Sequence, residues 1–208
     1  MSSAGRYDAA PRLPEEGEID PRVSLKSGDR PVEVEIGPGR GAFLIERLEA
    51  NPDIFLLGLE IRRKWASIVD DRLRARGIAP RGRVFAEDAR SVLPRFKSGT
   101  VSVVFLHFPD PWWKKRHVKR RVVTGDLLEQ IARLLVPGGE LFYQSDVPER
   151  ARDFEALAAE RFLPWDRTGP TARIEENPYG GSSNREKRAR TDGLPVIRLR
   201  YRRRSEPT

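Results

Sequence analysis

Three acidic residues stand close to the ends of predicted strands, where they could bind one ligand together. Glu35 precedes the glycines of EIGPGRG (35–41), Glu60 ends the next strand, and Asp88 follows the third. A carboxylate after the second strand can accept both hydroxyls of a ribose, and one after the third can accept an adenine amino group. One before the glycines can receive a cationic amine. Together they indicate a ligand with an amine, a ribose and an adenine but no phosphate, parts that S-adenosylmethionine has.

The glycine segment places Gly37, Gly39 and Gly41 between a strand and a helix. Glycines at such a turn let the backbone bend tightly and approach a ligand closely. The dinucleotide pattern GxGxxG is not complete, because position 42 is Ala, although Ala sometimes occurs there. A dinucleotide would also leave Glu35 without an obvious partner. We therefore expect Gly37 and Gly39 to contact the cofactor, with a plain strand-to-helix turn as the alternative.

A second segment with chemical potential is FPDPWWKKRHVKRR (108–121). Prolines on both sides of Asp110 restrict the turn that holds it. The following run of Lys and Arg suits phosphate binding, although elsewhere such a run would be a solvated face. The tryptophans could stack on a base, or one could belong to the core. Chemistry and anion binding are thus predicted to meet in one loop.

The composition limits the class of protein. The chain has 208 residues, enough for one domain, and 39 Lys and Arg against 31 Asp and Glu give a net charge of +8, which favours a polyanionic partner such as nucleic acid. With no Cys and only His107 and His117, we expect no disulfide and no metal. No stretch reads as a membrane span or a signal peptide. We expect a cytoplasmic protein with no membrane partner.

The elements that must position these residues alternate along the chain. Short apolar runs interleaved with amphipathic ones predict an α/β fold, a Rossmann-like, doubly wound, mostly parallel sheet of seven strands in a three-layer αβα arrangement. The expected strands are 31–36, 55–61, 83–87, 101–108, 140–145, 194–201 and a weaker one at 161–165. The expected helices include 62–76, 119–135 and about 149–160.

The two ends of the chain are expected to differ. In the last strand, which we expect to be antiparallel, apolar residues alternate with arginines, so one face should be buried and the other should show Arg198, Arg200 and Arg202 to solvent. Residues 1–30 contain few apolar residues and are predicted to form an extended or mobile arm. Residues 31–208 then form the single domain.

Taken together, these motifs resemble those of the bacterial tRNA (guanine-N7)-methyltransferases, which have the class I, Rossmann-like fold of S-adenosylmethionine-dependent enzymes. The resemblance covers about residues 31–204. It rests on EIGPGRG (35–41), GLEIRRK (58–64), EDAR (87–90), FPDPWWKKRHVKRR (108–121), LVPGGELFYQSD (135–146), SNRE (183–186) and GLP (193–195). The second and fourth motifs are far more specific than the glycine segment.

The resemblance implies roles for particular residues. Glu35, Glu60, Asp88 and Asp110 take cofactor-binding positions, and Asp110 also lies nearest the chemistry. The substrate-holding positions fall on Lys114, Asp146, Ser183, Asn184, Arg185 and Glu186. The RNA-contacting positions fall on Arg116, His117, Lys119, Arg120 and Arg121. The tail motif departs from the family, which usually has Thr at 183 and an aromatic residue at 185. The implied partner is tRNA, bound by a monomer or a homodimer.

The implied reaction fits a site poor in His and Cys. Guanine N7 carries an in-plane lone pair and needs no general base, so the enzyme mainly has to align the reactants. The resemblance implies the variable-loop guanine of tRNA as target and S-adenosyl-L-homocysteine as product. Two alternatives remain open: an amine-directed nucleic-acid methyltransferase, whose fourth-strand motif is similar to the turn at Asp110, and an RNA-binding protein that has lost catalysis.

Overall fold

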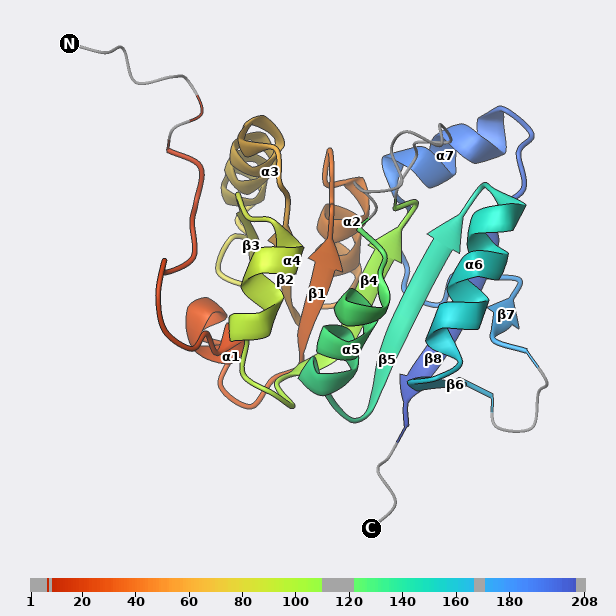
Figure 1. Ribbon diagram of the computed structural model, residues 1–208. Helices are drawn as coiled ribbons and strands as arrows, with labels where there is room; N and C mark the ends of the chain where they lie inside the picture. Colours follow the sequence, from red (N-terminus) through yellow and green to blue (C-terminus); the bar gives the residue numbers. More distant parts are fainter. Residues whose placement is uncertain (1–6, 8, 110–121, 167–170, 205–208) are drawn as a thin grey trace.

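The computed structural model describes residues 7, 9–109, 122–166 and 171–204. Its centre is a mixed sheet with the strand order β3-β2-β1-β4-β5-β8-β6, and β7 pairs with β8 beside this path (Figure 1). The strands are β1 (Val32–Ile36), β2 (Phe55–Leu59), β3 (Gly82–Phe85), β4 (Val101–His107), β5 (Leu135–Ser145), β6 (Phe162–Pro164), β7 (Arg173–Ile174) and β8 (Ile197–Arg203). The pairs among β1 to β5 are parallel, and β8 is antiparallel to β5, as predicted.

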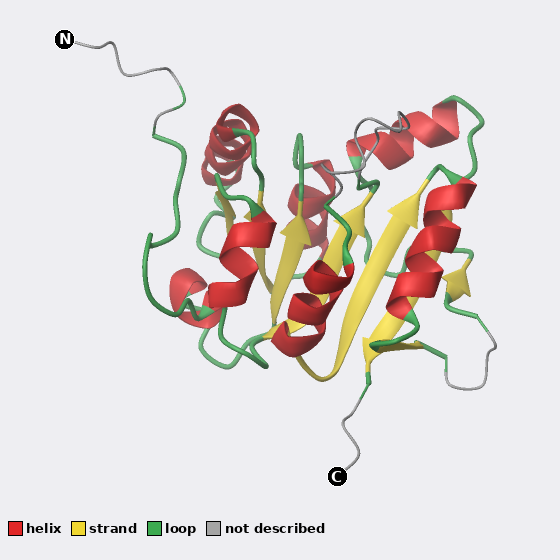
Figure 2. Ribbon diagram, in the orientation of Figure 1, coloured by secondary structure: helices red, strands yellow, loops and turns green. Residues whose placement is uncertain are grey.

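Helices cover both faces of the sheet, which gives the predicted three layers (Figure 2). The helices are α1 (Pro21–Leu25), α2 (Ala42–Ala50), α3 (Arg63–Ala75), α4 (Ala89–Val92), the 3-10 helix η1 (Leu93–Arg95), α5 (Gly125–Leu134), α6 (Pro148–Ala158) and α7 (Asn184–Thr191). One buried cluster joins α4, α5 and α6 to the sheet, and a second joins α2 and α3 to its other face.

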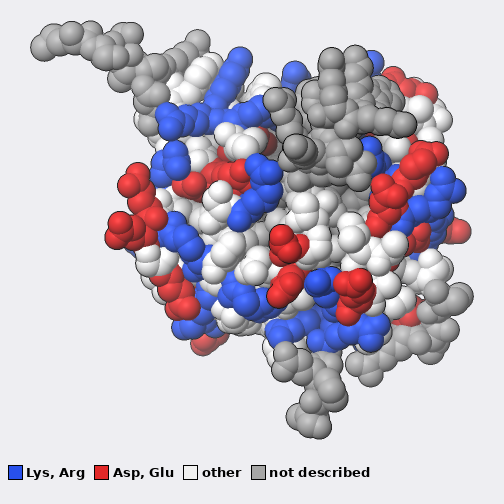
Figure 3. Space-filling view, in the orientation of Figure 1, with Lys and Arg blue, Asp and Glu red and all other residues white. Residues whose placement is uncertain are grey.

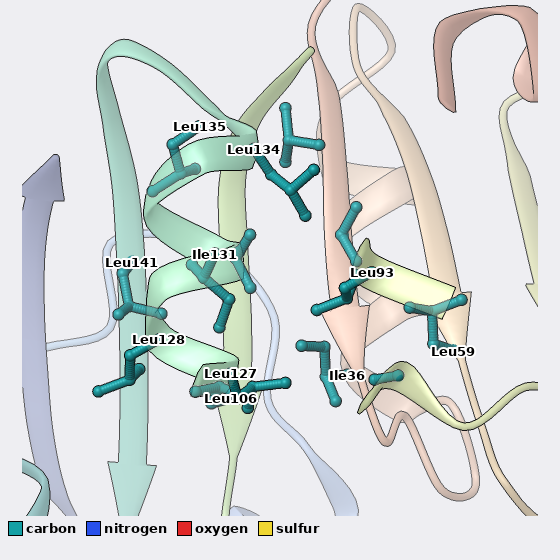
Figure 4. Packing of buried hydrophobic residues seen from close by; sticks show 14 of the residues in the cluster. Ile36, Leu59, Leu93, Leu106, Leu127, Leu128, Ile131, Leu134, Leu135 and Leu141 are labelled. Atoms are coloured by element: carbon teal, nitrogen blue, oxygen red, sulfur yellow. The ribbon is translucent and has the colours of Figure 1, made fainter. Parts of the chain in front are cut away.

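The helix α5 shows how a sequence pattern becomes packing. Its apolar residues recur every three or four positions, so they share one face. Figure 4 shows this face turned to the sheet, with Leu128 of α5 beside Leu141 of β5. Ile131 and Leu134 are fully buried on the same face. The helix begins where the Thr124 hydroxyl accepts a hydrogen bond from the Leu127 N–H, 3.2 Å away.

The strand β5 starts earlier than the sequence predicts. In its pairing with β4, Val101 lies opposite Leu135 but Val103 lies opposite Glu140, so the register shifts between these two pairs. The segment Pro137-Gly138-Gly139, which we expected to precede the strand, lies inside this irregularity. Gly138 has a φ of 75°, a conformation that glycine adopts without a steric cost. The structure also adds β7, a two-residue strand that the sequence does not indicate, so the sheet has eight strands rather than the expected seven.

The expectation that β8 presents Arg198, Arg200 and Arg202 to solvent is wrong, because none of the three is exposed. Arg198 is buried and donates to the Glu186 carboxylate at 2.8 Å. Arg200 is half-buried and donates to Glu140 at 2.7 Å. Strand periodicity indicates only that these residues share a face, and here that face is covered by α7 and by the segment around Tyr179. These two arginines are therefore structural.

Part of the segment expected to form an arm packs against the domain. Leu13, Ile19 and Leu25 are buried in the cluster on the α4 and α5 side of the sheet. Ile19 forms a parallel bridge with Phe96, and its N–H donates to the Arg95 carbonyl at 2.8 Å. A few apolar residues spaced along an otherwise polar segment are thus sufficient to attach it.

No helix within residues 9–109, 122–166 and 171–204 is both long and apolar enough to cross a membrane.

Candidate active site

The carboxyl ends of the central strands meet at one edge of the sheet, and the predicted acids lie along it. Ile36 of β1 is in register with Leu59 of β2, and Leu59 with Phe85 of β3. These three strands therefore end side by side, with Glu35 one residue before the end of β1, Glu60 directly after β2 and Asp88 three residues after β3, so the acids share one edge, as the sequence predicts. Ligands bind at this edge in open α/β sheets.

The Glu60 carboxylate ties the glycine loop to the end of β2. Its Oε2 accepts a hydrogen bond from the Gly39 N–H at 2.9 Å, and its Oε1 accepts from the N–H and the Nε of Arg62 at 3.0 and 3.1 Å. The side chain is 3% exposed. Because each carboxylate oxygen can accept two hydrogen bonds, Glu60 keeps the capacity to accept a ribose hydroxyl.

The glycines of the loop divide into two kinds. Gly37 and Gly39 have φ values of 72° and 56°, and a Cβ added to Gly37 would meet no heavy atom within 4 Å. At Gly39 the nearest atom would be a guanidinium nitrogen of Arg62 at 3.9 Å. A Cβ on Gly41, in contrast, would lie 2.4 Å from Val69 of α3. Gly41 thus permits close helix packing, whereas Gly37 and Gly39 border open space that a ligand can fill.

Glu35 is buried beside His107 at the ends of β1 and β4. Its Oε1 lies 2.8 Å from His107 Nδ1, and both side chains are 2% exposed. The Oε2 of Glu35 and the Nε2 of His107 are buried without a hydrogen-bond partner. Buried polar groups are normally paired, so an unpaired carboxylate oxygen next to the glycine loop is suited to a cationic group, directly or through a water. The ammonium of S-adenosylmethionine is such a group.

Asp88 begins α4 just beyond β3. Its Oδ1 accepts a hydrogen bond from the Arg90 N–H at 3.0 Å, and its Oδ2 lies 2.6 Å from the Arg90 guanidinium. The hydrogen bond from the Arg90 side chain holds the pKa of Asp88 below its ordinary value, although partial burial opposes the shift. Asp88 is therefore an ionised and partly exposed hydrogen-bond acceptor.

The predicted substrate residues that the structure describes gather where α7 meets the end of β5. Arg185 forms an ion pair with Asp146, which directly follows β5. The Ser183 hydroxyl accepts a hydrogen bond from the Glu186 N–H at 3.1 Å and so caps α7, and Asn184 is the exposed first residue of the helix. Ser183 performs this capping with the hydroxyl that it shares with the Thr usual in the family.

Glu186 differs from these neighbours because it is fully buried. Its Oε1 accepts hydrogen bonds from Arg198 at 2.8 Å and from Arg190 at 2.7 Å. Burial would raise the pKa of Glu186, but the hydrogen bond from Arg198 and the attraction of both guanidinium groups outweigh it and lower the pKa. In this structure Glu186 joins α7 to β8.

The chain leaves β4 towards the remaining predicted residues in a strained conformation. Phe108 has a φ of 49°, which is unusual for an aromatic residue, and its N–H donates to the Gln144 carbonyl at 2.8 Å. Pro109 follows at the edge between Glu35 and Asp146. Outside the described residues lie Asp110, Lys114, Arg116, His117, Lys119, Arg120 and Arg121.

Sequence reasoning missed three residues that shape this edge. His107 holds Glu35, Arg62 holds Glu60, and Arg198 holds Glu186. His107 and Arg62 each stand within three residues of a strand's carboxyl end, which is a signal that the sequence offered. Arg198 gave none, because the approach of α7 to β8 depends on tertiary structure.

The comparisons with known proteins agree with this edge. A family model described as "Putative methyltransferase" matches residues 29–199. Among curated proteins, a tRNA (guanine-N(7)-)-methyltransferase of Synechococcus sp. (strain JA-3-3Ab) is 37% identical over 88% of this chain and 76% of its own length. Another, of Rhodopirellula baltica, is 33% identical over 88% of this chain and 69% of its own. A third, of Paramagnetospirillum magneticum, is 40% identical over 68% of this chain, which spans 61% of that relative.

Solved structures support the fold alone, since their sequence identities are low. The 16S rRNA methyltransferase KamB superposes with a TM-score of 0.63 at 16% identity, over 88% of this chain and 92% of its own. A SAM-dependent O-methyltransferase of Thermotoga maritima gives a TM-score of 0.57 at 15% identity, over 93% and 69%. The chain belongs to the tRNA (guanine-N(7)-)-methyltransferase family and has the Rossmann-like fold of S-adenosylmethionine-dependent methyltransferases.

Proposed function

We propose that this chain transfers the methyl group of S-adenosylmethionine to N7 of a guanine in tRNA, the variable-loop guanine, and releases S-adenosylhomocysteine. The observation that carries the proposal is the row of Glu35, Glu60 and Asp88 beside an open glycine loop, in a chain of this family. The row offers acceptors for an amine, a ribose and an adenine in that order.

The described residues supply binding and orientation. In this proposal Glu35, held by His107, receives the ammonium of the cofactor. Glu60 accepts a hydrogen bond from a ribose hydroxyl, and Asp88 accepts one from the adenine amino group. When bound, S-adenosylmethionine supplies a sulfonium methyl group, and the N7 lone pair forms a bond to its carbon while the carbon–sulfur electrons return to sulfur. Because N7 carries no proton, the residues need only fix the positions of the two reactants, which can contribute about 7–11 kcal/mol.

Asp110 is the residue that we assign to the chemical step. The reaction moves positive charge from sulfur to the purine, so a carboxylate near the base accelerates it only by interacting better with the purinium than with the sulfonium. In the sequence Asp110 directly follows Pro109, the second residue after β4, and the sheet places β4 between β1, which carries Glu35, and β5, which precedes Asp146.

The substrate side combines Lys114 with Asp146 and the first turn of α7. The ion pair of Asp146 with Arg185 and the cap at Ser183 give this turn a defined position before substrate arrives. Arg185 can also stack on a base as a planar guanidinium, in place of the aromatic residue usual at this position. We assign Asn184 and Glu186 to the same substrate site by family position.

The proposal is tested by incubating the protein with methyl-labelled S-adenosylmethionine and unmodified tRNA, then mapping the label by chemistry selective for N7-methylguanine. We expect label at N7 of one guanine. Label on an exocyclic amine would instead identify an amine-directed methyltransferase. Binding of tRNA without binding of the cofactor would identify an RNA-binding protein that has lost catalysis.

A variant at Glu60 tests the cofactor site. Glu60→Ala is expected to raise the Kd for S-adenosylhomocysteine about 10- to 100-fold, because hydrogen bonds to charged groups contribute about 1.5–3 kcal/mol each. Isothermal titration calorimetry measures the change. Glu60→Gln keeps one acceptor oxygen and should lie between the wild type and Glu60→Ala. Glu49→Ala, which removes an exposed carboxylate on α2, is the control, and an equal loss in that variant would contradict the assignment.

A double variant tests the RNA interface. Charges of both signs are interspersed on the face in Figure 3, and many described arginines pair with carboxylates, so we assign backbone contacts to residues 116–121. Arg120→Ala with Arg121→Ala should weaken tRNA binding and flatten its salt dependence by about 0.7–0.9 log units per lost phosphate contact. Filter binding at several salt concentrations gives the slope.

The matched control for this double variant removes two arginines at the opposite edge of the sheet. Arg22→Ala with Arg76→Ala changes the net charge equally, but these residues lie near Leu25 and Gly77, which border a pocket at the first residue of β2. The salt slope of the control should match that of the wild type. Equal flattening in both double variants would show that net charge, and not the segment 116–121, determines the salt dependence.

A further inference from the structure

The segment 9–13, which we call the crossing segment, passes over the carboxyl end of β3. Ala10 is buried in the cluster on the α2 and α3 side of the sheet, together with Val84 and Ala86. Leu13 is buried in the cluster on the opposite side, together with Phe85. Between these two residues the chain must pass from one face of the sheet to the other. It does so at the edge where the cofactor residues lie.

Three sets of hydrogen bonds hold the crossing segment to the turn after β3. The Ala86 N–H donates to the Pro11 carbonyl at 2.8 Å. The Leu13 N–H donates to Glu87 Oε1 at 3.0 Å. The Arg12 guanidinium donates to both oxygens of the same carboxylate, at 2.7 and 3.2 Å. Such a two-point contact between guanidinium and carboxylate fixes orientation as well as distance.

The position of this contact relates it to one end of the cofactor site. Glu87 directly precedes Asp88, and the Glu60 N–H donates to the Phe85 carbonyl at 3.0 Å. The crossing segment therefore borders the acids proposed for ribose and adenine, whereas Glu35 stands beyond β2. Because β3 is the outermost strand on this side of the sheet, the adenine end has no further strand to enclose it.

The chain before the crossing segment continues along the same end of the site. The ammonium of Lys64 lies 5.9 Å from the ring centre of Tyr7 and 5.7 Å from that of Trp65. Lys64 and Trp65 belong to the first turn of α3, beside Arg40 of the glycine loop, whose guanidinium lies 5.1 Å from the Trp65 ring. This end of the site is thus bordered from the glycine loop to the turn at Asp88.

We propose that the crossing segment forms the outer wall of the adenosine end of the cofactor site, fixed there by the pair of Arg12 with Glu87. This inference rests on the proposed function for the identity of the cofactor. Since the wall and the ligand contact each other, each stabilises the other's bound position by the same free energy. The ordinary alternative is that the segment only covers the edge of β3 and so protects the sheet from pairing with other chains.

Calorimetry on two variants separates these possibilities. Arg12→Ala removes the guanidinium contact with Glu87. Arg95→Ala is the matched control, because Arg95 holds the stretch of chain that follows the crossing segment, through the carbonyls of Pro14 and Gly17. Arg12→Ala should raise the Kd for S-adenosylhomocysteine and for adenosine by the same factor, about three- to tenfold, or about 0.7–1.4 kcal/mol. Arg95→Ala should leave both constants unchanged within error.

A second measurement uses the wild-type protein and needs no activity. Trypsin cleaves after Arg12 only when the crossing segment leaves the sheet, so saturating S-adenosylhomocysteine should slow this cleavage by the same three- to tenfold factor. A lower Tm in Arg12→Ala with unchanged Kd values, or cleavage that the ligand does not slow, would overturn the inference and leave the proposed function intact. If the wild type binds no S-adenosylhomocysteine, the proposed function fails and this inference fails with it.

Discussion

Asp110→Ala is expected to lower the turnover number of methyl transfer by about 10²- to 10³-fold, the effect typical of losing one preorganised electrostatic contact to the transition state. The Kd for tRNA should change by less than about threefold, because we assign most of the contact with the RNA backbone to the basic residues that follow Asp110 in the sequence. Single-turnover kinetics with saturating enzyme separate the chemical step from binding and product release.

Asp110→Asn is the sharper companion variant, since it keeps the size of the side chain and removes its charge. If charge stabilisation of the purinium is the role of Asp110, both variants lose a similar part of the rate. If Asp110 instead orients the guanine by accepting hydrogen bonds from it, the Asn variant should keep more activity than the Ala variant. A loss of tRNA affinity as large as the loss of rate would remove Asp110 from the chemical step.

Glu186→Ala is expected to lower the free energy of unfolding by about 3–5 kcal/mol, because removing one partner of a buried ion pair leaves the other charge without compensation. The residue that would lose its partner is Arg198, a buried residue of β8. Urea denaturation followed by circular dichroism measures the change. A loss of this size would show that the main role of Glu186 is to fix α7 to the sheet.

Arg190→Ala is the control for this prediction. Arg190 pairs with the same carboxylate, but its side chain is 55% exposed, so its loss should cost less than about 1 kcal/mol. The pH dependence gives a further check, because the pKa of Glu186 is lowered in the fold. Its contribution to stability is complete above the ordinary Glu pKa and is lost as the pH falls through the lowered value. If Glu186→Ala were as stable as the wild type but bound tRNA more weakly, Glu186 would have a role in substrate binding and none in fixing α7 to the sheet.

The fold was predictable where hydrophobic periodicity is strong. The continuous apolar run 101–108 predicts a central strand, and β4 is buried along nearly its whole length. The spacing of Trp65, Val69 and Leu73 predicts the helix observed at Arg63–Ala75. Both signals work because local period and tertiary burial agree there.

The sequence was a poorer guide where charged residues pack against one another. The arginines of β8 alternate with apolar residues like those of a solvated strand face, yet Arg198 and Arg200 find carboxylates from segments distant in the sequence. The helix α7 is rich in charge and was not predicted, since its stability depends on its capping at Ser183 and on contacts with β8 and α2. Such pairings become visible only when both partners have been placed.

The candidate site followed from position more than from motif. Glu35, Glu60 and Asp88 were predicted to share one edge because each ends or follows a parallel strand, and the registers of β1, β2 and β3 confirm that these strand ends lie side by side. The partners that fix these acids were not predicted. A histidine at the end of a strand could equally belong to a core, and only the structure brings His107 within 2.8 Å of Glu35.

The direction of β8 has a practical consequence for working with this protein. Because β8 runs antiparallel to β5, Arg203 lies at the edge of the sheet opposite the acids, whereas Ala10 packs with Ala86, which directly follows β3. An affinity tag or a surface linker joined after β8 would therefore leave the proposed cofactor and RNA site free. The same tag joined before residue 9 would be held next to the turn at Asp88. Binding constants measured with amino-terminal fusions should be compared with carboxyl-terminal ones before they are interpreted.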